Sequence, residues 1–163
     1  QELGISETDS LLLRASQAAG SGDLTAAITF YNSAIEADNT RPEAHAGLAF
    51  TLLQNGEETL ALASAEKAVA MAPEDPRANY ALGHILRMIG EDDRALAALT
   101  SALQAEPELL IAVYEQGMIL AANGELENAL KNFERFLESH PGDESALTAI
   151  ASVKSRLGKT DTY

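Results

Sequence analysis

The chain has 163 residues, of which 46% are hydrophobic and only 5% aromatic, with no Trp and no Cys. This length allows one domain with a continuous core, which must close through small and aliphatic side chains. The formal net charge of −14 disfavours nucleic acid as a partner, because a phosphate-backbone binder needs clustered Lys and Arg. Without Cys, disulfides and thiolate zinc sites are excluded. No apolar run approaches the roughly 20 residues that a membrane span needs.

The first residues differ from the rest of the chain. Residues 1–7 show no helical period and are predicted to form a lead-in, in which Leu3 and Ile5 could dock onto the first helix or into a groove. Because the chain opens at Gln1 rather than Met, removal of an upstream signal or lipidation segment is one expectation. The sequence does not decide between a cytoplasmic and a periplasmic location.

A glycine followed by an acidic residue recurs every 34 residues, and so does an alanine five positions after each glycine. The pairs are Gly22-Asp23, Gly56-Glu57, Gly90-Glu91 and Gly124-Glu125, and the alanines are Ala27, Ala61, Ala95 and Ala129. Glycine takes the left-handed conformation past the C-terminus of a helix, and an acid favours the positive end of the next helix. Each pair therefore predicts a corner between two antiparallel helices, and the fixed period indicates a repeat array.

Apolar periodicity and proline give the limits of the repeats. Apolar residues recur every three and four positions from Asp9, which predicts a first helix with Ser6 or Thr8 as its N-cap. The second helix is expected from about Leu24 to Ala37. Prolines end the later second helices, since proline cannot continue a helix. The chain then divides into a lead-in, four helix pairs, a capping helix with a polar outer face and a tail: 1–7, 8–41, 42–75, 76–109, 110–143, 144–158 and 159–163.

With this register the chain resembles the tetratricopeptide repeat family over almost its whole length. The resemblance is carried by small residues within the first helices, the repeated alanine, a mostly large residue within the second helices and a closing residue: Ala15, Ala49, Gly83, Gly117; Ala27, Ala61, Ala95, Ala129; Tyr31, Ala65, Leu99, Phe133; Asn39, Pro73, Pro107, Pro141. The departures are Leu11, His45, Asn79 and Val113, where the family often has Trp, and Phe136, where it has a small residue. The resemblance implies an all-α fold, a right-handed α-solenoid of about nine helices.

The resemblance also implies that the first helices line a concave groove. The residues predicted to face this groove, here called the groove set, are Phe50, Leu53, Arg77, Tyr80, His84, Arg87, Met88, Ile111, Tyr114 and Met118. Exposed apolar patches mark interaction sites, and Arg77 and Arg87 beside Tyr80 are candidates to hold a carboxylate or a peptide backbone. Two alternatives stay open: the apolar members belong to the core, and the arginines pair with Glu74 or Asp75 and with Glu115.

No arrangement typical of an enzyme is found. His45 is expected to pack in the core, His84 to lie on the groove, and His140 to end a helix before Pro141. None has a second ligand at metal spacing on the same face, so no metal or cofactor is expected. No Ser, His and Asp set shares a cleft, which predicts a protein without enzymatic activity.

Two functional hypotheses follow. The first is a scaffold or adaptor that binds a peptide or helix of a protein partner in its concave groove, and it is similar to bacterial repeat proteins that assist assembly of envelope, pilus or secretion machines. The groove's Leu12 and Ser16 stand where chaperone-binding members have Lys and Asn, which disfavours a chaperone tail as partner. The alternative is a self-associating module that pairs through the groove or through the first repeat, at Leu12 and Leu13. The oligomeric state, monomer or homodimer, is left open.

Overall fold

The computed structural model describes residues 5–160, and side chains as far as Gly158. Within this range the chain forms nine helices and no strand: α1 (Glu7–Gly20), α2 (Leu24–Ala37), α3 (Pro42–Gln54), α4 (Glu58–Met71), α5 (Pro76–Met88), α6 (Asp92–Ala105), α7 (Leu110–Ala122), α8 (Leu126–Ser139) and α9 (Glu144–Thr160). The predicted all-α solenoid is confirmed.

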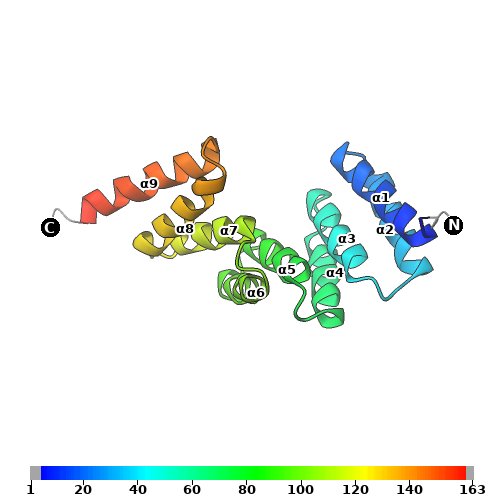
Figure 1. Ribbon diagram of the computed structural model, residues 1–163. Coiled ribbons are helices and arrows are strands. Elements are labelled where there is room, and N and C mark those ends of the chain that lie inside the picture. Colours follow the sequence, from blue (N-terminus) through cyan, green and yellow to red (C-terminus); the bar gives the residue numbers. More distant parts are fainter. Residues whose placement is uncertain (1–4, 161–163) are drawn as a thin grey trace.

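The helices are arranged as an open arch. Each helix packs against the next one along the chain, and α3 also contacts α5. Figure 1 shows the two ends of the chain at opposite ends of the arch, with α4 and α6 along its lower side. The odd-numbered helices α3, α5 and α7 therefore form one continuous surface, and the even-numbered helices lie behind them.

The repeated glycines turn the chain as predicted. Gly22, Gly56, Gly90 and Gly124 have φ angles of 82°, 81°, 83° and 87°, in the left-handed region that favours glycine. At the first corner the Asp23 N–H donates to the Ala18 carbonyl at 2.9 Å, and Asp23 Oδ1 accepts from the Ala26 N–H at 3.0 Å. One residue pair thus closes α1 and caps α2.

Small residues let the paired helices approach closely. Ala27, Ala61, Ala95 and Ala129 are all fully buried. A Cβ added at Gly83 would lie 2.7 Å from Leu99 Cγ, and one at Gly117 would lie 2.8 Å from Phe133 Cε1. A larger residue at these two glycines would therefore force the helices apart.

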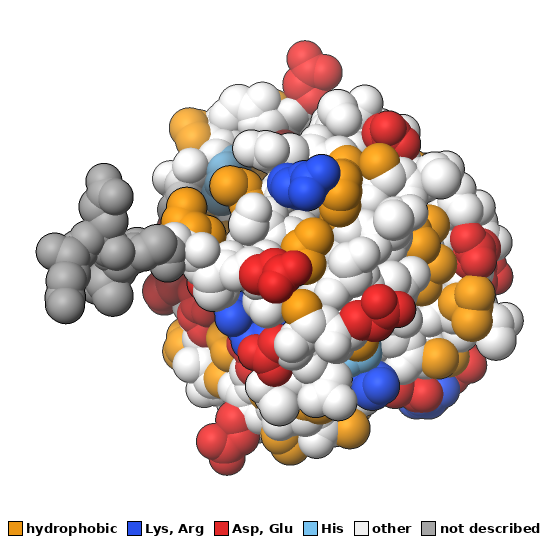
Figure 2. Space-filling view, turned by 90° about the vertical axis from the view of Figure 1, so that its right-hand side faces the viewer, with side chains coloured by type: hydrophobic (Ala, Val, Ile, Leu, Met, Phe, Trp, Pro, Cys, Tyr) orange, Lys and Arg blue, Asp and Glu red, His pale blue; other side chains and the backbone are white. Residues whose placement is uncertain are grey.

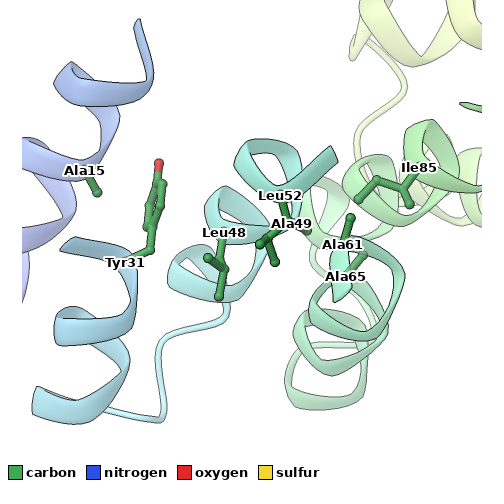
Figure 3. Close-up of a cluster of buried hydrophobic side chains, with 8 residues drawn as sticks. All are labelled: Ala15, Tyr31, Leu48, Ala49, Leu52, Ala61, Ala65 and Ile85. Atoms are coloured by element: carbon green, nitrogen blue, oxygen red, sulfur yellow. The ribbon is translucent and has the colours of Figure 1, made fainter. Parts of the chain in front are cut away.

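The core crosses the boundaries between repeats: one cluster extends from Ala15 in the first repeat to Ile85 in the third. In Figure 3 Tyr31 of α2 stands between Ala15 of α1 and Leu48 of α3, and Ala61 of α4 continues the cluster toward Ile85 of α5. Each repeat buries its apolar face only by stacking on its neighbour, as is usual for solenoids.

The helix ends, the first N-cap and the burial of single residues can be compared with the sequence predictions. Ser6 is the N-cap of α1, accepting from the Asp9 N–H at 3.0 Å. Helix α2 has the predicted limits, whereas α9 continues to Thr160, two residues beyond the predicted end. Ile5 is 73% exposed, so the prediction that it docks onto the array is wrong. Leu3 lies outside the described residues. His45 is buried, as expected. None of the described helices is long and apolar enough to cross a bilayer.

Candidate functional site

The groove set comes from three helices that follow one another on the concave surface. Helix α3 supplies Phe50 and Leu53, α5 supplies the residues from Arg77 to Met88, and α7 supplies Ile111, Tyr114 and Met118. The structure separates these side chains into a central cluster, a group that packs toward the core and a group that is exposed.

The centre of the groove is a cluster of three rings, here called the aromatic triad: Phe50, Tyr80 and His84. Ring centroids lie 5.8 Å apart for Phe50 and Tyr80, 5.4 Å for Phe50 and His84, and 6.1 Å for Tyr80 and His84, all in tilted arrangements. Tilted pairs at such distances are favourable beyond the area that they bury. The triad therefore joins α3 to α5 and leaves part of each ring accessible.

A polar cluster, here called the ionic bridge, joins α5 to α7. Glu115 of α7 is only 5% exposed. Its Oε1 lies 2.8 Å from His84 Nδ1, and its Oε2 accepts from Arg87 Nε. A buried carboxylate needs such partners, because an unpaired buried charge is costly. His84 belongs to both the triad and the bridge, and so connects three helices.

Burial and charge shift the pKa values of two groove residues. Burial, with the nearby Glu115 carboxylate, raises the pKa of Tyr80 to about 12, so its hydroxyl stays protonated and can donate a hydrogen bond. Burial alone would raise the pKa of Glu115, but the hydrogen bonds from His84 and Arg87 outweigh it and hold that pKa below its ordinary value. The bridge therefore keeps a carboxylate charged inside the groove wall.

Other members of the groove set pack toward the core. Tyr114 lies against Phe133 and Phe136 of α8, with ring centroids 5.5 and 5.1 Å apart. Met118 packs against the cluster around Phe133, and Leu53 against the cluster around Tyr31. All three stay partly exposed.

The exposed members are Arg77, Met88 and Ile111. Met88 is 52% exposed and Ile111 39%, so both present apolar area to solvent. Among residues 5–160 Arg77 makes no ion pair. Arg87 pairs with Glu115, which is the pair that the sequence left open as an alternative to partner binding. Arg77 is therefore the better placed of the two arginines to meet an anionic group.

Glu115 is the residue that sequence reasoning undervalued, since it entered only as a partner for Arg87. A signal was present in the register: the equivalent residues of the other repeats are Leu13, Gly47 and Ala81, all without charge. A single carboxylate at an otherwise apolar repeat position indicates either a buried pair or a site.

The histidines do not gather. His45 is buried in α3, and its Nε2 has no hydrogen-bond partner among the residues that the structure describes; the rings of His140 and Phe136 stack with centroids 4.4 Å apart. Across the part of the chain that the structure describes, no group of His, Cys, Asp and Glu could hold a metal ion.

Comparison with protein families agrees with the architecture. The model of the Tetratricopeptide repeat family matches residues 46–109 and 80–144, which together cover more than half of the chain. The chain belongs to the tetratricopeptide repeat family. No curated protein matches it significantly.

Solved structures show the same fold. A crystal structure of MamA has a TM-score of 0.75 and 26% identity, covering 94% of this chain and 84% of that one. PilF of Pseudomonas aeruginosa has a TM-score of 0.85 and 21% identity, covering 93% and 69%. YrrB, described as a TPR protein with an unusual peptide-binding site, has a TM-score of 0.70 and 25% identity, covering 91% and 76%. The chain is therefore similar in fold to these three proteins over most of its own length.

Proposed function

We propose that the protein is a non-enzymatic scaffold that binds a peptide or helix of a protein partner in its concave groove, at the aromatic triad and the exposed residues beside it. The observation that carries the proposal is the contrast in exposure along α5 and α7. Met88 and Ile111 are exposed on the same helices that bury Ile85, Leu86, Val113 and Ile119 in the core, so they are free to contact a partner.

The chemistry of the groove fits a peptide. The triad offers flat apolar area with a polar tip at Tyr80, and Met88 offers an adaptable thioether. Arg77 adds a cation at the rim without an ion pair among the described residues. These groups suit a segment with an apolar anchor and a carboxylate or backbone carbonyl next to it.

The similarity to YrrB, whose structure is described by its peptide-binding site, supports this class of function. The proposal extends to a role in assembling a bacterial multiprotein complex, which would use the groove to hold one component.

Affinity capture with a groove variant tests the proposal. The double variant Met88→Asp, Ile111→Asp changes two exposed residues, so it should fold as wild type does while losing its partner. Tyr114→Ala is less suitable, because Tyr114 packs on Phe133 and Phe136 and its loss would weaken the fold. The measurement is mass spectrometry of proteins captured by each form, with circular dichroism as the check on folding.

The matched control is Ala97→Asp, Ala63→Asp, which adds the same charges at exposed positions of α6 and α4 on the other side of the array. A protein captured by wild type and control but lost from the groove variant would support the proposal. Equal capture by all three forms would contradict it.

Self-association is a second candidate, favoured by one observation: Leu13 of α1 is 53% exposed at the first repeat. The exposed end of an array is where a second copy could stack. Light scattering of wild type and Leu13→Asp separates the two ideas, since self-association predicts a dimer that the substitution dissociates.

A further inference from the structure

The ionic bridge determines which ring nitrogen of His84 carries a proton. Burial opposes the charge of Glu115, but hydrogen bonds from His84 and Arg87 hold the pKa of this carboxyl below its ordinary value, so it is a carboxylate. A carboxylate has no proton to donate. Across the 2.8 Å between Glu115 Oε1 and His84 Nδ1, the histidine must therefore be the donor. The neutral imidazole of His84 then has its proton on Nδ1 and a lone pair on Nε2.

The Nε2 atom of His84 and the hydroxyl of Tyr80 are both free to bind. Within residues 5–160 neither atom has a hydrogen-bond partner. In the same range the one buried side-chain polar atom without a partner is Nε2 of His45, so the free atoms of His84 and Tyr80 are reached by solvent. Burial raises the pKa of Tyr80 to about 12, which keeps its hydroxyl protonated. One turn of α5 thus presents a donor at Tyr80 and an acceptor at His84.

The surroundings of this acceptor favour a neutral donor. The rings of Phe50 and Tyr80 lie beside His84, with centroids 5.4 and 6.1 Å from that of its own ring. A cation at Nε2 would be repelled by Arg87, which pairs with the same carboxylate as His84. A partner carboxylate would set its lone pairs against the lone pair of Nε2. A main-chain N–H is neutral, and the carbonyl of the same chain can accept from the hydroxyl of Tyr80.

A protein partner offers these main-chain groups where it is extended. In a helix the N–H and C=O groups bond to one another, apart from those of the first and last turns. In an extended segment successive side chains point to opposite faces, so apolar side chains on one face could contact the exposed Met88 and Ile111. The free donor and acceptor on α5 therefore favour an extended segment over a helix.

We propose that His84 recognises the main chain of an extended partner segment by accepting an N–H at Nε2, while Tyr80 donates to a carbonyl of that segment. Glu115 is the positioning residue that makes His84 an acceptor, although it is itself only 5% exposed. The inference rests on the proposed groove function and names how the groove recognises its partner. It gives the ionic bridge a role beyond joining α5 to α7.

NMR of the ring nitrogens tests the tautomer without any ligand. In ¹⁵N-labelled wild type at alkaline pH, His84 should show a protonated Nδ1 and an unprotonated Nε2. In Glu115→Gln the amide can donate to Nδ1, so the Nε2–H form should gain population. A purely structural role of Glu115 would leave the tautomer unchanged. Wild type in the Nε2–H form, or the same tautomer ratio in both proteins, would overturn the proposal.

Peptides test the contact itself. The probes are peptides selected by binding to wild type from a random display library that lacks Lys and Arg. Figure 2 shows more acidic than basic side chains on the N-terminal face of the molecule, so basic peptides would bind by charge alone. Each selected peptide is resynthesised with one amide at a time replaced by an ester, which removes one N–H and keeps the side chains. At one position the ester should weaken binding to wild type roughly tenfold, because Nε2 is left unpaired.

Matched variants assign that position to His84. His84→Asn keeps a side-chain N–H for Glu115 and removes Nε2, so it should bind the amide and the ester peptide equally. Tyr80→Phe loses only the hydroxyl and should keep the difference. Circular dichroism and thermal melts check that each variant is folded. Peptides that bind in the groove without an ester position coupled to His84 would overturn this inference alone.

The groove variant Met88→Asp, Ile111→Asp separates this inference from the proposed function. Loss of the selected peptides in that variant would locate them in the groove, as both proposals require. Unchanged binding to the groove variant would contradict the proposed function and this inference together.

Discussion

Two tyrosines at the same position of successive repeats have different surroundings. Tyr80 contacts Phe50 of α3 and His84 of its own helix α5, whereas Tyr114 contacts Phe133 and Phe136 of α8. The second helix of the third repeat has Leu99 and Ala102 where the fourth has these two phenylalanines. The larger rings give Tyr114 an aromatic partner within its own repeat, so only Tyr80 joins its neighbours in the groove.

The joints between the helices differ in the same way. Helices α3 and α5 meet through the aromatic triad, and α5 and α7 meet through the ionic bridge around Glu115. Truncating a side chain in an apolar joint lowers the free energy of unfolding in proportion to the apolar area removed. In a joint built on a buried charge, the free energy of unfolding falls when a partner is removed, because the charge is left unpaired. The two joints should therefore respond to substitution and to pH in distinguishable ways.

The largest effect is expected from Arg87→Met, which leaves Glu115 with His84 alone. Breaking a buried ion pair is strongly destabilising, and because Arg87 is partly exposed we expect a loss of roughly 2–4 kcal/mol in the free energy of unfolding. Arg94→Met is the matched control: its two ion pairs are exposed, and its loss should cost less than about 1 kcal/mol. Urea denaturation measures both, and equal losses would show that Glu115 does not depend on its pair.

A smaller effect is expected from Phe50→Ala, which removes one ring of the triad. Because Phe50 is only half-buried, the cost should be about 2 kcal/mol, below the 3–5 kcal/mol of a fully buried aromatic residue. The same substitution should also weaken partner binding, which Arg94→Met should not. A variant as stable as wild type would mean that the triad does not join α3 to α5.

The pH dependence of stability should separate the joints further. The lowered pKa of Glu115 contributes stability above its ordinary value of 4.5, and this contribution is lost as the pH falls through the lowered folded-state value. Below pH 4.5 the melting temperature of wild type should therefore fall more steeply than that of Glu115→Gln. Parallel curves of melting temperature against pH would contradict the lowered pKa of Glu115.

The smallest effect concerns His45 on the α3 side. Burial, with the nearby Lys67, lowers the pKa of His45, so the unfolded chain binds a proton first as the pH falls below 6.5. Wild type should lose stability from pH 6.5 downward, and His45→Leu should lack this loss. A decline of equal size in both forms would assign it to other groups.

The repeat pattern predicts most of the fold because its signals are local. The glycine at each corner needs a positive φ, and the fully buried Ala27 and Ala61 leave room for one helix packing only. The groove is predicted less completely, since helix phase gives a face but not the direction of a side chain near its edge. Tyr114 shows this limit: whether it faces the groove or α8 depends on the size of residues 19 and 22 positions further along the chain.

The ionic bridge is predicted only as one of two alternatives, for another reason. Glu115 and its partners are separated by 28 and 31 residues, and both the paired and the unpaired arrangement satisfy the repeat register. Only the distance between α5 and α7 decides that the carboxylate is buried with His84 and Arg87 rather than exposed to a ligand.

The most direct test of the groove is site-specific photocrosslinking in cells or in extract. A photoreactive benzoylphenylalanine at position 88 would lie on α5 in the proposed groove, and the same residue at position 97 would lie on α6, outside it. If the groove is the partner site, position 88 should crosslink to one short segment of a partner protein, and position 97 should not reach that segment. Crosslinks to the partner from position 97 alone, or equally from both positions, would contradict it.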